Sequence, residues 1–544
     1  MTLLPFKAEN SMKRFVAVFT FLFLFIINSS SQVSPTPIGT DTMRLVEILR
    51  TNRYGYEKKD SITALQILVG QVHLKERTTH FYADSTVINN GARIIEAFGN
   101  VHINDNDSVH TYSQYLLYNL NTKIAILKNK VRLTDDKTNL YTEELEYDVN
   151  QKIGIYRNGG RVLNGTSTLT SKEGTYYADL KDVYFKNDVV LKDPKYDLKS
   201  DSLLYNTTTE IATFISETFI IDSAKRSIKT REGYYDLKNK KAFFGKRPVI
   251  TDRSVRIIAN EVETDDNTGI NRLRGSAVFI DTAQGISVLA NYIESNRNEG
   301  WFRATQNPLM ILKQENDSIY ITGDTLYSGK LSSLIADSLV KDTIKNKTVV
   351  DINNDSTDRY FQAFRHVRIF SDSLQAVSDS LFYSGKDSIF KLFNEPIVWA
   401  NASQVTGDTI YLYTKNKKAE RLYVFENGLV INQTGEGMFN QVKGNRLFGY
   451  FTDGAIDYMR AKGNAESVYY VRDNAQLLVG INKATGDIID MRFKAKELNR
   501  VVFISDIKGT MFPVSQMPEE EKTLRNFEWH EKKRPKTKYE LFGN

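Results

Sequence analysis

The sequence contains no cysteine and only 10 prolines among its 544 residues. Without cysteine the chain can form no disulfides, no thiolate metal sites and no cysteine nucleophile, and so few prolines exclude collagen-like and proline-rich classes. The chain also lacks a strong excess of positive or negative charge, because its 72 Lys and Arg nearly balance its 66 Asp and Glu. No strongly charged partner is therefore predicted. Hydrophobic residues make up 41% of the chain, which is enough to bury a core.

Long hydrophobic runs are lacking except at the N-terminus. Lys13 and Arg14 precede an uncharged apolar run, Phe15 to Ile27, and small residues follow at Ser29 to Ser31. A membrane-spanning helix needs about 20 apolar residues, so this shorter run predicts a cleaved signal peptide and an exported, soluble protein. A retained N-terminal anchor is the alternative interpretation. Removing residues 1–31, which carry a net charge of +2, leaves a mature chain of about +4.

The body of the chain repeats one strand motif, a small or polar residue followed by Val, any residue and an apolar residue. Its valine position recurs at intervals of 27 to 31 residues, at Val101, Val131, Val162, Val189, Phe219, Val249, Val278 and Leu309. Tyrosines keep the same period at Tyr118, Tyr147, Tyr177, Tyr205 and Tyr235. A unit of this length cannot bury its apolar face alone, so successive units are expected to stack into one elongated body.

Within each unit apolar and polar residues alternate, as in Val131-Arg132-Leu133. This alternation is typical of half-buried strands, and turn-forming clusters such as Asn104 to Asp107 separate them. Short helices are expected at the two ends, over Asp41 to Arg50 and after Pro518. The predicted organisation is a signal peptide (1–31), a linker with a short helix (32–60), a β-repeat region (61–340), an irregular polar insertion (341–359), a further β-repeat region (360–515) and a charged C-terminal helix or tail (516–544).

Motifs of known catalytic chemistry are absent from the sequence, including phosphate-binding loops, zinc-binding His-Glu-x-x-His and nucleophile elbows. His73 and His102 occupy equivalent positions, and the alternation places both outward, so a stacked surface pair is favoured over a metal site. An aspartate followed by Ser or Thr recurs at Asp84, Asp201, Asp324, Asp379 and Asp408. Repeated carboxylates favour a structural role in turns over calcium binding or catalysis. The sequence therefore predicts a protein that is not an enzyme and has no cofactor or metal.

Three phrases carry a family resemblance: Ala97 to Ile103, Ser200 to Asn206 and Ser378 to Tyr383. Recurring near every 30 residues, they resemble the OstA-like (organic solvent tolerance) family, which includes the periplasmic lipopolysaccharide-transport bridge protein and the N-terminal domain of the outer-membrane lipopolysaccharide assembly protein. The resemblance implies an antiparallel β-jellyroll whose groove holds lipid A acyl chains and which joins end to end with similar domains. It covers 61–330 best and 360–515 more loosely.

The resulting hypothesis is a periplasmic lipid-binding scaffold in lipopolysaccharide transport or assembly at the outer membrane. Its partners would be lipopolysaccharide and other transport proteins, with possible self-association and no nucleic acid. The residues expected to face inward and contact acyl chains, or to form a plain core, are Val72, Leu74, Val101, Ile103, Val131, Leu133, Val162, Val189, Leu191, Phe219 and Ile221. Two alternatives stay open, an exported β-solenoid enzyme acting on polysaccharide and a structural or adhesive surface repeat protein.

Overall fold

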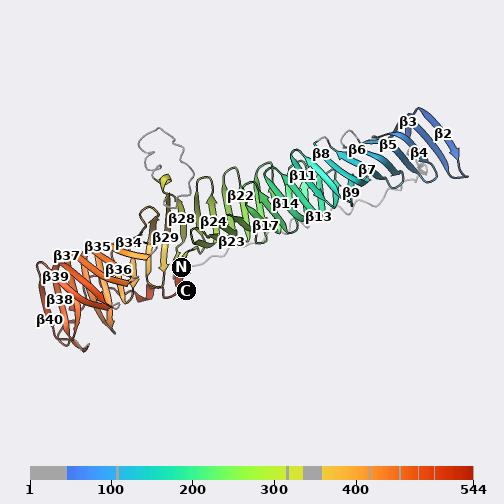
Figure 1. Cartoon of the computed structure of the whole chain (residues 1–544). Helices are drawn as coiled ribbons and strands as arrows, with labels where there is room; N and C mark the ends of the chain where they lie inside the picture. Colours follow the sequence, from blue (N-terminus) through green and yellow to red (C-terminus); the bar gives the residue numbers. More distant parts are fainter. Residues whose placement is uncertain are drawn as a thin grey trace, which may run out of the picture.

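The structure, a computed structural model, is an elongated stack of strands (Figure 1). It describes residues 46–105, 109–135, 137–313, 318–334, 358–415, 418–452, 455–473, 475, 477–494 and 497–542. The strands pair antiparallel with their neighbours along the whole stack, from β2 (Arg53–Lys58) at one end to β40 (Lys508–Phe512) at the other. The predicted all-β, elongated, antiparallel fold is confirmed. The expected signal peptide and most of the polar insertion lie outside the described residues.

The strands between residues 64 and 148 are long and cross the full width of the stack, whereas many later strands are divided in two. The first fourteen are β1 (Glu47–Arg50), β2 (Arg53–Lys58), β3 (Ala64–Glu76), β4 (Thr79–Asn89), β5 (Ile94–Asp105), β6 (Val109–Asn119), β7 (Ile124–Thr134), β8 (Thr138–Asp148), β9 (Ile153–Tyr156), β10 (Gly160–Asn164), β11 (Ser167–Ser171), β12 (Glu173–Tyr177), β13 (Asp182–Asp193) and β14 (Tyr196–Asn206).

The middle of the stack consists mostly of divided strands. They are β15 (Ile211–Phe214), β16 (Thr218–Asp222), β17 (Ser227–Thr230), β18 (Glu232–Asp236), β19 (Lys241–Gly245), β20 (Val249–Asp252), β21 (Val255–Ile258), β22 (Glu261–Asp265), β23 (Ile270–Asp281), β24 (Ile286–Asn296), β25 (Trp301–Thr305), β26 (Leu309–Lys313), β27 (Ser318–Thr322) and β28 (Thr325–Lys330).

The C-terminal part contains the longest of the described strands and ends in a segment with three 3-10 helices. Its elements are β29 (Arg359–Phe370), β30 (Gln375–Ser384), β31 (Ile389–Phe393), β32 (Ile397–Ala400), β33 (Ser403–Thr406), β34 (Thr409–Lys415), β35 (Lys418–Gly435), β36 (Met438–Thr452), β37 (Ala455–Arg472), β38 (Leu478–Lys494), β39 (Glu497–Ile504), β40 (Lys508–Phe512), η2 (Glu519–Glu521), η3 (Glu531–Lys533) and η4 (Lys538–Phe542). Both β27 and β28 pair with β29, so the sheet continues across the insertion.

The long strands bend, and the divided strands are interrupted, at one register, which we call the corner. In β3 the residues Gly70 and Gln71 both have positive φ, and together they oppose the single residue Asp84 of β4. This is a β-bulge, which bends a strand and sharpens its twist. Two consecutive positive-φ residues also mark the corner at Gly99–Asn100, Asn129–Lys130, Asn187–Asp188, Lys246–Arg247, Gly275–Ser276, Gln306–Asn307, Arg365–His366, Asn394–Glu395, Glu426–Asn427 and Gly463–Asn464.

The corner divides the sheet into two legs that face each other across an apolar interior. The first leg contains strand halves such as Ala64–Val69 of β3, and the second leg contains halves such as Val72–Glu76. Phe81 of the second leg lies 5.2 Å from Tyr118 of the first, measured between ring centroids. One cluster of buried side chains runs without interruption from Leu68 to Phe493. The continuous interior predicted from the repeat is therefore present.

The short helix expected over Asp41 to Arg50 is not what the described residues form. Glu47–Arg50 is strand β1, paired with the second leg of β3, while β2 pairs with the first leg. Without these two strands the backbone N–H and C=O groups along one side of β3 would be unpaired at the end of the stack. The stabilisation from pairing these backbone groups outweighs the helical tendency of the local sequence. Residues 41–45 lie outside the described residues.

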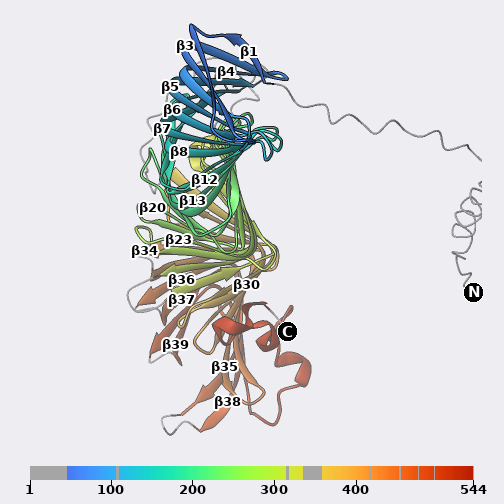
Figure 2. The same cartoon turned by 90° about the vertical axis from the view of Figure 1, so that its right-hand side faces the viewer.

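The C-terminal segment (513–542) packs against the outer face of the second leg, where Figure 2 shows it in red. Its Met517 and Leu524 are buried against Leu429, Ile431 and other side chains that point away from the interior. No α-helix occurs among its described residues, which contain only the three 3-10 helices. The expected charged C-terminal helix or tail is thus a docked segment, although most of its lysines remain exposed.

Three buried glutamines of the outer face hold this segment, two of them by its backbone. Gln404 Nε2 donates to the carbonyl oxygen of Glu528 at 2.8 Å, and its Oε1 accepts from the backbone N–H of His530 at 2.8 Å. Gln441 bonds the backbone of Lys522 and Leu524 in the same two-sided way. Gln375 Oε1 instead accepts from the guanidinium of Arg534. Amide side chains suit this role because each offers both a donor and an acceptor.

We expect Gln404→Ala to loosen the C-terminal segment and to destabilise the chain by about 1–3 kcal/mol, because it leaves buried backbone groups unpaired. Hydrogen exchange should rise at residues 516–542 and stay unchanged in β3 to β8. Gln284→Ala, in an exposed turn, is the matched control. Unchanged exchange in the segment of the Gln404 variant would show that the amide contacts do not hold it.

Candidate functional site

Most of the residues predicted to face inward do so. Nine of them are buried, with at most 7% of their surface exposed, and they belong to the interior cluster: Val72, Leu74, Val101, Ile103, Val131, Leu133, Val162, Val189 and Leu191. All nine lie on the second leg, at the corner or two residues beyond it. Contact of these side chains with a lipid remains a prediction.

The predictions for Phe219 and Ile221 are wrong. These side chains are 48% and 55% exposed, and the inward residues of β16 are Thr218 and Ile220. The run Thr218 to Ile221 is apolar or β-branched throughout, so alternation alone does not reveal which residues face inward. The register decides, because Thr218 pairs with Ser200, which in turn pairs with Val189 of the corner. The inward position is thus one residue earlier than the 30-residue spacing predicts.

A row of tyrosines from alternate strands fills the interior of the first leg. Its members are Tyr118, Tyr147, Tyr176, Tyr205 and Tyr235. The strands between them present small side chains at the same register, such as Ala125 and Gly154. The tyrosine spacing predicted this row, except that it named Tyr177 where the inward residue is its neighbour Tyr176.

The row lies near the edge of the first leg that is farthest from the corner, where the two legs meet again. We call this edge the mouth. Tyr118 donates a hydrogen bond to Glu76 of the second leg at 2.7 Å, and Lys123 forms a buried ion pair with the same carboxylate. Further along the same edge, the side chain of Asn164 in the second leg donates a hydrogen bond to the hydroxyl of Tyr205 at 3.0 Å. Burial raises the pKa of Tyr205 to about 12, so its hydroxyl stays neutral. The legs therefore touch across the mouth in the N-terminal part.

Sequence reasoning missed the second-leg side of the mouth. A carboxylate, or once an amide, ends the second leg at intervals of 29 or 30 residues: Glu76, Asp105, Asp135, Asn164, Asp193, Asp222, Asp252 and Asp281. Several accept hydrogen bonds from a Ser or Thr in or next to a neighbouring turn, as Asp105 does from Thr79 at 2.9 Å. The constant interval of these residues in the sequence could have predicted this row.

A cavity of about 340 Å³ opens in the interior between β14 and β24. It begins where the tyrosine row ends, because the next two tyrosine positions in that register hold Thr264 and Ser295. These shorter side chains leave space that tyrosines fill elsewhere. The volume lies within the range of about 300–1,000 Å³ that is usual for small-molecule sites.

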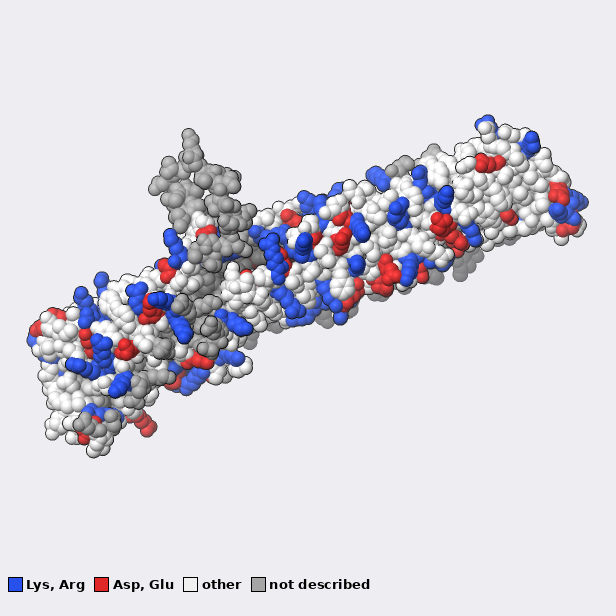
Figure 3. Space-filling view, viewed as in Figure 1, with Lys and Arg blue, Asp and Glu red and all other residues white. Residues whose placement is uncertain are grey.

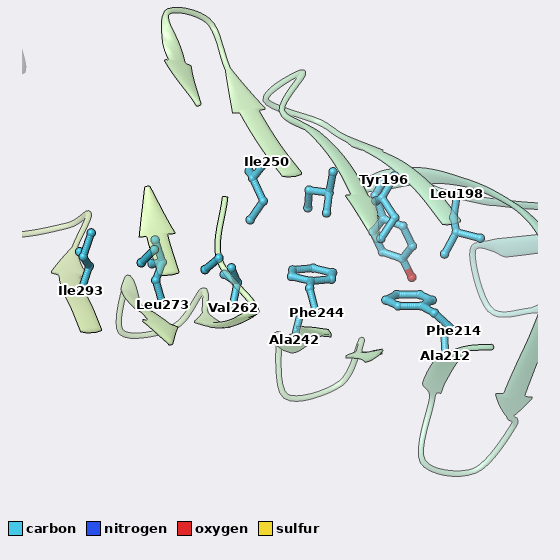
Figure 4. Close-up of a cluster of buried hydrophobic side chains, with 14 of the residues drawn as sticks. Tyr196, Leu198, Ala212, Phe214, Ala242, Phe244, Ile250, Val262, Leu273 and Ile293 are labelled. Atoms are coloured by element: carbon cyan, nitrogen blue, oxygen red, sulfur yellow. The ribbon is translucent and has the colours of Figure 1, made fainter. Parts of the chain in front are cut away.

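The walls of the cavity are apolar and its rim is charged. Figure 4 shows Ile250 of the second leg and Phe244, Val262 and Leu273 of the first leg on opposite sides of this space. The rim carries four cationic side chains, Lys195, Arg226, Lys240 and Arg297, and three acidic ones, Asp222, Asp252 and Asp266. Such a site suits an amphiphile, with its chain inside and its polar group at the rim. Charges of both signs are likewise interspersed over the outer surface in view in Figure 3.

The recurring aspartates have a structural role, but at the corner and not in strand-connecting turns. Asp84 accepts a hydrogen bond from the side chain of Asn100 at 2.9 Å, and Asp408 accepts one from Asn427 at 3.1 Å. Asn100 and Asn427 are themselves positive-φ bulge residues, so each contact ties one strand's bend to the next. Among the described residues there is no cluster of three or more potential metal ligands.

His73 and His102 lie outside, as the alternation predicts, in a stacked column on the second leg. His73 stacks on Tyr82 at 4.3 Å, and His102 stacks on Tyr112 at 4.4 Å. Arg132 continues the column over the face of Tyr112 at 4.6 Å. Each histidine also contacts a second one, since His73 Nε2 lies 2.9 Å from His80 Nδ1 and His102 Nε2 lies 3.1 Å from His110 Nδ1.

Comparison with known proteins places this architecture in context. Residues 43–201 match the OstA-like protein family, which confirms the resemblance over that stretch. Among solved structures, the chain is similar to the crystal structure of LptH, the LptA-homologous periplasmic component of the lipopolysaccharide transport device from Pseudomonas aeruginosa. That similarity has 12% identity and a TM-score of 0.19, and it covers 26% of this chain and 82% of that chain. No curated protein matches the chain. Within the described residues, no helix has the length and apolar character that a membrane span requires.

Two adjacent isoleucines test the assignment of the interior. Ile220→Ala should destabilise the chain by about 2–5 kcal/mol, because it empties a packed position, whereas Ile221→Ala should change stability by no more than about 0.5 kcal/mol. Urea unfolding of the two variants measures the difference. Equal losses would contradict the register described for β16.

The histidine pairs predict a pH dependence of stability. Burial and the neighbouring histidine lower the pKa of both His73 and His102 from the usual value near 6.5. The unfolded chain therefore takes up protons first, and stability should fall as the pH drops below about 6.5 but not change above it. Urea midpoints at several pH values should show a weaker acid loss in the double variant His73→Gln, His102→Gln. His366→Gln, at a side chain that is 80% exposed, should keep the full loss.

Proposed function

We propose that the chain is a non-enzymatic, periplasmic lipid-binding scaffold that takes part in lipopolysaccharide transport to the outer membrane or in its assembly there. The observation that carries this proposal is the continuous apolar interior, which widens into a cavity with a charged rim between β14 and β24. The match of residues 43–201 to the OstA-like family supports it. The name of the similar solved structure, a component of a lipopolysaccharide transport device, points the same way.

An acyl chain would enter the cavity through the mouth and lie against side chains such as Ile250 and Leu273. Each methylene removed from water contributes about 0.8 kcal/mol. The polar part of the lipid would stay at the rim, where cationic and acidic side chains alternate. No bond of the lipid is made or broken in this process, so the protein supplies a path and not a catalyst.

Movement along the chain requires the mouth to open in the N-terminal part. There the contacts of Tyr118 with Glu76 and of Asn164 with Tyr205 join the two legs. They are side-chain contacts, so they can separate without breaking strand pairing. A lipid that advanced from the cavity would replace them one at a time.

Partners would bind at the ends of the stack, where no further strand among the described residues pairs with the outer edges. At the N-terminal end these are β1 and β2, with exposed Tyr54 and Tyr56, and at the other end they are β39 and β40. Other lipopolysaccharide-transport proteins or a second copy of the chain would extend the interior by adding strands there.

Photo-crosslinking in the producing cell tests the proposal. A photoreactive residue at Val131 or Leu273, which both face inward, should yield lipopolysaccharide adducts. The same residue at the outward neighbours Arg132 and Arg272 should yield none, or at least tenfold fewer. Equal labelling at inward and outward positions, or no labelling of well-expressed protein, would contradict lipid binding in the interior.

A further inference from the structure

One row of outward side chains crosses the outer face of the second leg and changes its chemistry along the stack. From His73 of β3 to Lys199 of β14 the row is polar or aromatic, except at Val190. From β16 to β26, in the green middle of Figure 1, the same row is apolar at six of its seven positions. These six residues, which we call the apolar strip, are Phe219, Val249, Ile258, Val278, Leu289 and Leu309.

The apolar strip is accessible. Phe219 is 48% exposed, Ile221 beside it on β16 is 55% exposed, and the other members are partly exposed. Ile280 and Ile311 widen the strip toward the mouth. A sheet face that meets only water carries polar residues at alternate positions, and a contiguous exposed apolar set on a folded chain marks an interaction surface. The apolar run that concealed the register of β16 is therefore half core and half surface.

The same outward row is covered further along, where the C-terminal segment packs on it. The row continues to Leu429 of β35, which is 3% exposed and lies in one buried cluster with Met517. The last described element of the segment, η4, contacts β27 and β29, where Arg368 donates to the carbonyl oxygen of Glu540 at 2.9 Å. The strip begins on the next strand, so it continues a surface that the chain already uses for packing.

The strip does not suit a second peptide segment of the same kind. Gln404 and Gln441 hold the C-terminal segment by its backbone, whereas no outward residue in the second-leg parts of β16 to β27 is Asn or Gln. A peptide backbone laid over the strip would leave its N–H and C=O groups without such partners, which costs free energy. The apolar face of another sheet brings side chains and not backbone, and this chain carries such a face itself.

We propose that the apolar strip binds the same strip of a second copy of the chain, so that two stacks pair side by side through their second legs. A two-fold axis brings one patch against itself, and two sheets pack face to face about 10 Å apart. Lys229, the polar position of the row, lies 5.0 Å from the ring centre of Phe219 and 2.9 Å from Glu217, so its charge is compensated.

The size of the face fits a dimer. Eight neighbouring second-leg strands, from β16 to β27, contribute four or five residues each. At about 4.8 Å between strands and about 3.3 Å per residue they present roughly 600 Å² of flat face. Side chains raise the accessible area above this value, which approaches the roughly 800 Å² that each partner of a stable complex buries.

Pairing through the strip leaves the interior and the mouth of both copies open, because these lie on the other side of the second leg. It also differs from addition of strands at the ends of the stack. The inference is therefore independent of the proposed function. Its failure would leave the expected lipopolysaccharide adducts at Val131 unchanged.

Sedimentation velocity of the full chain over about a hundredfold range of concentration should show a shift from one copy to two. Ile221→Lys combined with Val278→Lys should raise the dissociation constant at least about a hundredfold, because each new charge would be buried without a partner. Tyr54→Lys combined with Tyr56→Lys adds the same charge at the end of the stack, at side chains that are 56% and 60% exposed. This control should dimerise as the original chain does, and melting curves verify folding.

A second measurement needs no destabilising change. The chain has no cysteine, so Thr251→Cys places a single thiol at an exposed position beside the strip. Its reaction with a maleimide should slow about tenfold at concentrations that favour the dimer, while Gln284→Cys, in the exposed turn, should react equally at all concentrations.

Three results would overturn the proposal. One is a single copy at every concentration, whether or not the chain then binds phosphatidylcholine–phosphatidylglycerol vesicles, since such binding would make a lipid surface the occupant of the strip. Another is a dimer that persists unchanged in the folded Ile221 and Val278 double variant. The third is slower maleimide reaction of Tyr56→Cys in place of Thr251→Cys, which would show association at the ends.

Discussion

The structure depends on one backbone constraint, a bend or an interruption of the strands at the same register. A sheet can fold along a line and keep its hydrogen bonds only if each strand turns at the matching position. The bulges at the corner provide this turn, with residue pairs such as Gly99–Asn100 in the left-handed region. The side chain of Asn100 then reaches Asp84 of the preceding strand, which keeps neighbouring bends aligned. Two facing legs, an interior and a mouth all follow from that alignment.

The functional site follows from a change in side-chain size along this otherwise regular interior. Tyrosines alternate with small residues through the N-terminal part, and their hydroxyls meet the carboxylates and amides that end the second leg. Where Thr264 and Ser295 stand at the tyrosine positions, the interior is less filled and the cavity appears. The regular repeat thus forms the continuous apolar interior, and a departure from the repeat forms the cavity within it.

Sequence reasoning recovered the stack and the inward face wherever polar and apolar residues alternate strictly, as in Val131-Arg132-Leu133. It failed at Phe219 and Ile221 because four apolar or β-branched residues in a row carry no alternation, and only pairing with β14 reveals the face. The prediction of a helix up to Arg50 was wrong for a related reason. A local sequence pattern does not show that the edge of β3 would otherwise be unpaired. The cavity could not be predicted either, because it is lined by residues of many strands between β14 and β24 that meet only in the folded register.

The docked C-terminal segment has a consequence for the order in which the chain can assemble. Strands β3 to β8 pair with neighbours that follow within one turn, so the N-terminal part can close strand by strand as it is made. Gln404 and Gln441, however, contact residues more than 80 positions later. The outer face of the C-terminal part stays uncovered until the last residues arrive. Folding of that end thus requires the complete polypeptide. A prematurely terminated chain would leave the apolar outer face, including Leu429 and Ile431, exposed to solvent.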